Sequence, residues 1–152
     1  MQNKFFKKYT LLLFIFFSSY FFSQIKKINF LIMIDEKPCL IVNDLRLSSS
    51  SVGLLDANYI VGTINLSDEN YNKLINDKSS NFDVNFETIL PKLPLAQKYI
   101  FSLPKEFLNQ KYIIINIFNK SSKIYKKRYS GGNKNNKEYY VVITSPDFSK
   151  LE

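Results

Sequence analysis

Apolar and polar residues alternate along most of this chain beyond residue 25. The alternation is clearest near the start of this region, at Ile28, Phe30, Ile32 and Ile34. A period of two places alternate side chains on one face of an extended backbone, which is typical of a β-strand. Since segments of this kind recur almost to the end of the chain, the sequence predicts a mostly β fold.

The strongest of these segments covers residues 112–118. One face would carry Ile113, Ile115 and Ile117, and the other would carry Tyr112, Ile114 and Phe118. A strand that is apolar on both faces needs cover on both sides. We therefore expect this strand to lie centrally in its sheet.

Further strands are expected between loops and turns. The predicted ranges are 38–43, with an extension through Leu45 and Leu47; 59–66, with Ile60, Ile64 and Leu66 on one face; 83–89, with Val84 and Phe86 inward; and 98–103, with Tyr99, Phe101 and Leu103 inward. The serine-rich run 48–51 and Gly53 read as a loop. Ser67 followed by two acids predicts a helix over 68–76, and Pro104 begins one helical turn at 104–109.

The last unit is predicted to be a hairpin of strands 123–130 and 138–145, joined by a loop at 131–136. In total we expect seven or eight short strands and one or two short helices. This pattern favours a single antiparallel β-sandwich-like domain, with a small α+β domain as the alternative.

Residues 1–24 have the composition of a secretory signal peptide. Lys4, Lys7 and Lys8 precede an apolar run that ends near Ser23, and the run is shorter than the roughly 20 residues that span a membrane. The segment resembles export signals of Gram-negative bacteria of low GC content. We expect an exported protein, periplasmic, outer-membrane-associated or secreted, with residues 25–152 as its domain; retention of the segment as an anchor is the alternative.

The domain is moderately basic and has a single cysteine. Residues 1–24 hold three of the 21 basic residues and none of the 13 acidic ones, so the net charge falls from +8 to +5 without them. A basic surface favours encounter with anionic partners. Cys39 cannot form an intramolecular disulfide, and we expect it to be buried as a small apolar residue rather than exposed as a free thiol.

The chain contains no histidine, which disfavours an enzyme. Histidine is the commonest general base and a frequent zinc ligand, and no catalytic, cofactor-binding or metal-binding motif stands out. The carboxylates of Asp83 and Glu87 are the first candidates for an enzyme. Together with Asn85 they would project from one face of a strand. These oxygen atoms could ligate calcium, but the simpler interpretation is that this face of the strand is exposed to solvent.

The one surface feature that suggests a function is the basic and aromatic first strand of the last hairpin. Its candidate anion-binding residues are Lys123, Lys126, Lys127 and Arg128, with Tyr125 and Tyr129 interleaved. Cations among aromatic rings suit phosphates or acidic sugars. The competing interpretation is an edge strand on which lysines discourage pairing with another molecule.

Two classes of function follow. The first is a non-enzymatic interaction module of the cell envelope that contacts another envelope protein or an anionic glycan or lipid, and an inhibitor or immunity protein would look the same in sequence. The second is a small exported enzyme that works with carboxylates. We expect no cofactor, no nucleic acid and, after signal cleavage, no transmembrane segment.

Overall fold

The alternating segment at the start of the domain forms the long strand β1 (Ile25–Ile34), whose Ile28, Phe30, Ile32 and Ile34 are buried as predicted. A computed structural model describes residues 24–89, 96–129, 137–147 and 149–151. The predicted signal peptide and the loops at 90–95 and 131–136 lie outside these ranges, apart from Gln24. The structure therefore leaves the export prediction untested.

The first sheet is built around β1 and contains seven strands. Its order is β11 (Ser149–Leu151), β10 (Tyr139–Thr144), β9 (Ile113–Asn119), β1, β6 (Gly62–Ser67) and β5 (Asn58–Ile60), and β2 (Lys37–Pro38) pairs with the end of β1. β9 lies between β1 and β10, and Ile113, Ile115 and Ile117 are fully buried. The predicted central position of this strand is confirmed.

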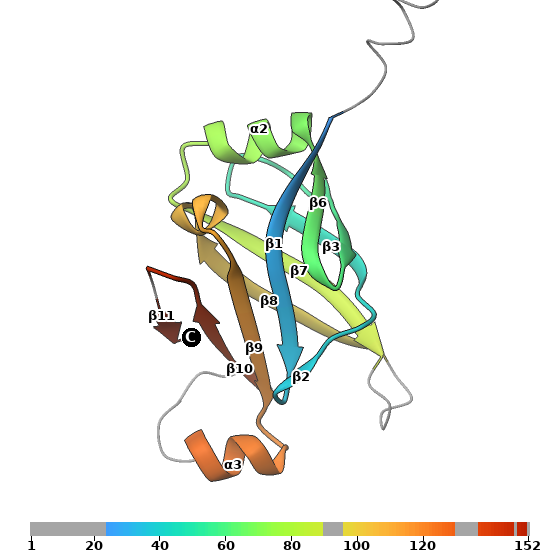
Figure 1. Cartoon of the computed structure of the whole chain (residues 1–152), viewed down its shortest axis with the longest axis vertical. Coiled ribbons are helices and arrows are strands. Elements are labelled where there is room, and N and C mark those ends of the chain that lie inside the picture. The colour runs from blue at the N-terminus through green and yellow to red at the C-terminus, as the bar shows by residue number, and fades with distance from the viewer. Residues whose placement is uncertain (1–23, 90–95, 130–136, 148, 152) are drawn as a thin grey trace, which may run out of the picture.

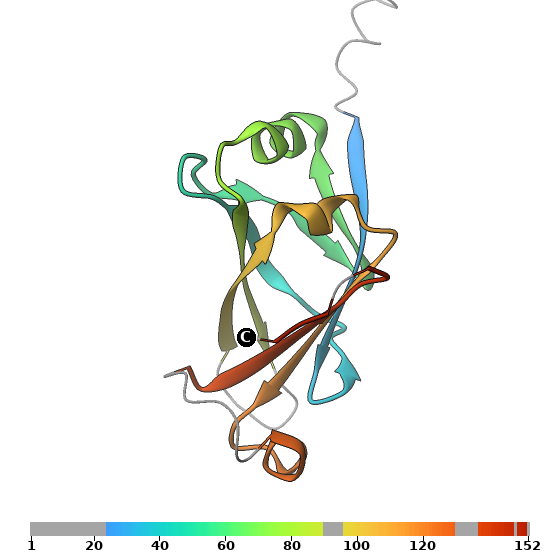
Figure 2. The same ribbon diagram turned by 90° about the vertical axis from the view of Figure 1, so that its left-hand side faces the viewer.

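The second sheet has four strands and packs across the first (Figures 1 and 2). Its order is β4 (Leu55–Asp56), β3 (Asn43–Ser48), β7 (Asn81–Ile89) and β8 (Ala96–Pro104). Val84 and Phe86 of β7, and Tyr99, Phe101 and Leu103 of β8, are buried as expected. After β8, Lys105–Asn109 forms the predicted helical turn, a 3-10 helix labelled η1.

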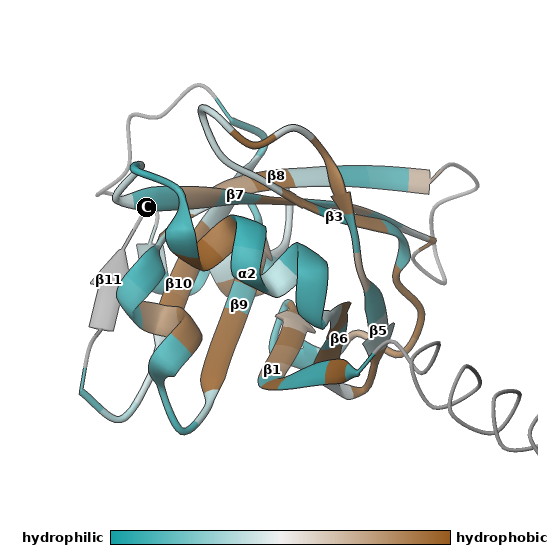
Figure 3. Ribbon diagram, turned by 90° about the horizontal axis from the view of Figure 1, so that it is seen from above, coloured by the Kyte–Doolittle hydropathy of each residue, from teal (hydrophilic) through white to brown (hydrophobic). Residues whose placement is uncertain are grey.

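Helix α2 (Asp68–Asn76) closes one end of the sandwich (Figures 1 and 3). The Ser67 hydroxyl accepts a hydrogen bond from the Asn70 backbone N–H at 3.2 Å, which confirms the predicted cap. Leu74 points into the core and is fully buried. The helix thus covers an end of the core that strands alone would leave open.

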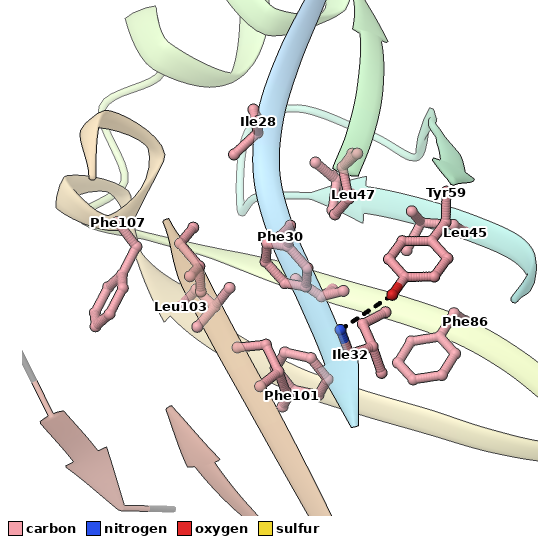
Figure 4. Close-up of a cluster of buried hydrophobic side chains, with 14 of the residues drawn as sticks. Ile28, Phe30, Ile32, Leu45, Leu47, Tyr59, Phe86, Phe101, Leu103 and Phe107 are labelled. Carbon is pink, nitrogen blue, oxygen red and sulfur yellow. Dashed lines mark hydrogen bonds between the residues drawn. The ribbon is translucent and has the colours of Figure 1, made fainter. Parts of the chain in front are cut away.

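The core fills the space between the two sheets, and Figure 4 shows part of it. The Tyr59 hydroxyl reaches into it and accepts a hydrogen bond from the Ile32 N–H at 3.2 Å. The pairing of β6 with β1 ends at Phe30, opposite Gly62. The Tyr59 hydroxyl therefore replaces the backbone acceptor that β6 no longer offers to the Ile32 N–H. A side chain here completes the hydrogen bonding of a buried strand.

The mostly β, sandwich-like fold with two short helices is confirmed, while several details of the prediction are wrong. The described residues hold eleven strands, some only two or three residues long, where we expected seven or eight. One pair, β1 with β9, is parallel within an otherwise antiparallel arrangement. The predicted strand 59–66 is a hairpin that reverses at Gly62, whose φ is +87°, and Ile60 is therefore exposed rather than inward.

The predicted strand at 38–43 is also wrong. β2 ends at Pro38 and β3 begins at Asn43, and Leu40 and Ile41 between them are exposed. Cys39 is buried in this segment, as expected. Its N–H donates to the Ile32 carbonyl at 2.8 Å, after which the chain leaves the first sheet and crosses to the second. The crossing prevents continuous pairing, although the residue types favour a strand.

Candidate functional site

The basic segment that we expected to be a strand forms helix α3 (Lys123–Tyr129) at the end of the molecule opposite α2 (Figure 1). Ser122 caps it, since its hydroxyl accepts from the Tyr125 N–H at 3.2 Å. Both the hairpin of residues 123–145 and its role as a protected edge are therefore wrong. Instead, β10 pairs with β9. The signal that could have revealed the helix is a capping serine followed by tyrosines four residues apart.

The inner face of α3 is aromatic and rests on the end of the first sheet. Tyr129 lies 5.0 Å from Phe118 and 4.9 Å from Tyr140 between ring centroids, and Tyr125 lies 6.1 Å from Tyr140. Burial raises the pKa of Tyr140, with smaller contributions from the neighbouring tyrosines. Tyr125 and Tyr129 thus pack the helix onto the sheet, and they do not share the lysine-bearing face as the strand prediction required.

The outer face of α3 presents three lysines together. Lys123, Lys126 and Lys127 follow the spacing i, i+3, i+4, which groups side chains on one side of a helix, and all three are exposed. Within the described part of the chain, none of the three ammonium groups has an ion-pair partner. This lysine face, as we call these three residues, concentrates positive charge at one end of the protein.

Arg128 differs from the three lysines, because its guanidinium pairs with the Glu36 carboxylate. Glu36 and Asp35 form the tight turn between β1 and β2, and both have a positive φ, of 65° and 48°. Such a turn usually contains glycine or asparagine. The ion pair joins this strained turn to α3, so we assign Arg128 to positioning the helix rather than to binding.

A polar network anchors the chain where β9 leads into α3. The Asn119 backbone N–H and side-chain amide each donate to the Asp35 carboxylate at 3.1 Å. The Tyr99 hydroxyl shares its one proton between the side-chain oxygens of Asn119 at 3.0 Å and Gln97 at 2.7 Å. Burial raises the pKa of Tyr99 to about 12. Tyr99 therefore stays protonated and able to donate, and the network holds the base of the lysine face in place.

The carboxylates considered for an enzyme lie on the outer face of the second sheet. Asp83, Asn85 and Glu87 alternate with buried residues of β7, as predicted for one face. Four residues of strand separate Asp83 from Glu87 by about 13 Å. The paired carboxyls of glycosidases lie about 5 to 10 Å apart. This spacing disfavours joint action of the two groups on one bond.

Glu87 also lines a polar groove of about 630 Å³ with Asp44, Arg46 and Asp56. The Arg46 guanidinium lies 3.4 Å from the Asp56 carboxylate, which neutralises part of the groove. In the described residues no three aspartate, glutamate or cysteine side chains lie close enough together to hold a metal ion. Among the same residues no helix combines the length and the apolar character needed to cross a membrane.

Asp77, which follows α2, has the most strongly perturbed carboxylate in the described structure. The nearby Ser49 hydroxyl and the hydrogen bonds that the Ser51 and Ser79 hydroxyls donate hold the pKa of this carboxylate well below its usual range. Its side chain is only 2% exposed, and the Lys105 ammonium lies 3.9 Å away. The carboxylate thereby ties the serine loop to the end of α2 and to the start of η1. We assign this network to stability.

Folding stability should therefore depend on the charge of Asp77. Because the folded state has the lower pKa, the carboxylate stabilises it above about pH 4, where an unfolded aspartate is ionised, and the contribution is lost as the pH falls. Asp77→Asn should lower the free energy of unfolding at pH 7. The difference from wild type should shrink below about pH 4 in urea titrations. Asp83→Asn, which removes an exposed carboxylate, is the control, and a constant difference down to pH 2 would contradict this role.

No protein-family model, curated protein sequence or solved structure matches this chain significantly. The candidate site is thus defined by geometry and charge alone.

Proposed function

We propose that this protein is a non-enzymatic interaction module of the cell envelope that binds an anionic glycan or lipid. The observation that carries the proposal is the lysine face, in which Lys123, Lys126 and Lys127 are exposed together without an ion-pair partner among the described residues. Phosphate and carboxylate groups are the ligands that match clustered ammonium groups. The buried aromatic face of α3 and the pair between Arg128 and Glu36 support it further, because they hold the lysines on a fixed support.

A simpler role for these basic residues is to stabilise helix α3. Lys126, Lys127 and Arg128 lie in the last turn of α3, where positive charge stabilises the negative end of the helix. Lys123 lies in the first turn, where a positive charge is unfavourable. Helix stability therefore does not account for Lys123, and the position of Lys123 on the lysine face supports the proposed ligand binding.

Charge reversal tests the proposal. Lys123→Glu/Lys126→Glu should weaken binding to heparin, an acidic glycan, or to vesicles containing phosphatidylglycerol by about a hundredfold, since each lysine near an anionic surface contributes about 1 kcal/mol and reversal adds repulsion. Binding by the wild type should weaken steeply between low and high salt. Co-sedimentation and titration calorimetry measure both effects.

The matched control is Lys78→Glu/Lys111→Glu, which changes the net charge equally at exposed positions. Lys78 closely follows α2, and the Lys111 carbonyl accepts a hydrogen bond from Asn29 of β1, so neither residue belongs to α3. The control should keep most of the affinity. Equal losses of affinity in both variants would show that binding depends only on the net charge of the protein, and not on the lysine face. Absence of wild-type binding to either ligand at low salt would overturn the proposal and favour a protein partner, as for an inhibitor or immunity protein.

A further inference from the structure

An apolar hollow of about 530 Å³ opens beside β2, on the side of the molecule where the chain crosses between the sheets. Its rim carries three large apolar side chains, Leu40, Ile41 and Ile89, which are 72%, 61% and 58% exposed. Leu40 is the most exposed large apolar residue in the described structure. Grouped exposure of this kind marks an interaction site more often than single exposed residues do.

Leu40, Ile41 and Ile89 form what we call the apolar patch, and hydrogen bonds hold the backbone beneath it. The Thr88 hydroxyl donates to the Ile41 carbonyl at 2.6 Å, and the buried Cys39 thiol lies 3.3 Å from the same oxygen. Cys39 faces the core, while Leu40 and Ile41 are displayed to solvent. A fixed backbone lowers the entropic cost of inserting the two side chains into an apolar phase.

The patch lies at the same end of the molecule as the lysine face. β2 follows the β1–β2 turn, and Glu36 in that turn contacts Arg128 of α3. Both views of the ribbon place β2 and α3 at the end opposite α2 (Figures 1 and 2). Lys37, which is exposed, lines the hollow and extends the positive charge from α3 to the apolar rim.

We propose that this end of the protein docks onto a bilayer that carries anionic headgroups. Lys37 and the lysine face would meet the headgroups, while Leu40 and Ile41 enter the boundary between headgroups and acyl chains. Peripheral proteins bind bilayers stably when apolar insertion and basic charge act together, because either one alone is weak. This inference rests on the proposed function and selects a lipid surface rather than a soluble glycan as the ligand.

The test compares an apolar variant with a matched control on the domain of residues 25–152. Leu40→Ser/Ile41→Ser should reduce binding to vesicles of phosphatidylcholine and phosphatidylglycerol by about tenfold or more, as measured by flotation. Leu54→Ser/Ile60→Ser removes side chains that are 58% and 61% exposed elsewhere on the surface, and it should bind as wild type does. All four positions are exposed, so thermal melts should show folded variants.

Soluble heparin separates the two proposals. If Leu40→Ser/Ile41→Ser loses vesicle binding but keeps heparin binding, the bilayer inference is supported. If the wild type binds heparin but not vesicles, or if this variant binds vesicles unchanged, the inference fails and the proposed anion binding stands. A wild-type dimer that this variant converts to monomer, with vesicle binding unchanged, would assign the patch to self-association and also overturn the inference.

Discussion

Replacing Phe86 with alanine is expected to lower the free energy of unfolding by about 3 to 5 kcal/mol. Phe86 is fully buried on the inner face of the second sheet, 5.3 Å from the Tyr99 ring and 6.4 Å from the Phe101 ring. The substitution leaves a cavity in β7 beside two rings of the neighbouring strand β8. Since these strands hold their side chains in place, little of the cavity can collapse.

Urea unfolding followed by fluorescence and circular dichroism measures this cost. Phe86→Leu is the matched control, because it keeps most of the apolar volume and should cost clearly less than the alanine variant. If Phe86→Ala lost less than about 1 kcal/mol, the core around Phe86 would not be packed as closely as the burial of its side chain indicates.

Ile115→Ala is expected to cost about 2 to 5 kcal/mol. Ile115 is fully buried in β9, which pairs with β1 on one side and β10 on the other, so the strand cannot shift to fill the space. Ile60→Ala, in the edge strand β5 where the side chain is 61% exposed, should change stability by about 0.5 kcal/mol or less. Similar losses in the two variants would contradict the central position of β9.

The segments predicted best are those in which local pattern and tertiary environment agree. β1, β7, β8 and β9 have one apolar face or two, and the sandwich offers an apolar interior at the same spacing. Helix α2 carries its own start signal in Ser67, so its bounds follow from residues that are close in the chain. In these five elements, residues close together in the chain were enough to predict the element.

The segments predicted wrongly are those in which residue type and position in the fold conflict. Leu40 and Ile41 favour a strand by type, but their backbone crosses between sheets and is held there by Thr88. Residues 59–66 continue to alternate through Gly62, yet the chain turns back at that point. Alternation describes which side a residue takes only while the chain keeps its direction.

The candidate site was found in part. All six of the basic and aromatic residues lie in α3, but the expected alternation mixed lysines and tyrosines on one face. A helical period separates them, with Tyr125 and Tyr129 inward and the lysine face outward. Arg128 could not be told from the lysines, because its partner Glu36 is remote in sequence.

The amino-acid sequence by itself determined the β-rich class, the central strand β9, the capped helix α2 and the basic character of α3, because each depends on residues within one short segment. The tertiary structure alone decided the parallel pairing of β1 with β9, the ion pair between Arg128 and Glu36, and the exposure of Leu40 and Ile41. These features join positions far apart in the chain. The stability of these contacts depends on which surfaces the fold brings together, and the spacing of apolar residues within one segment does not predict that.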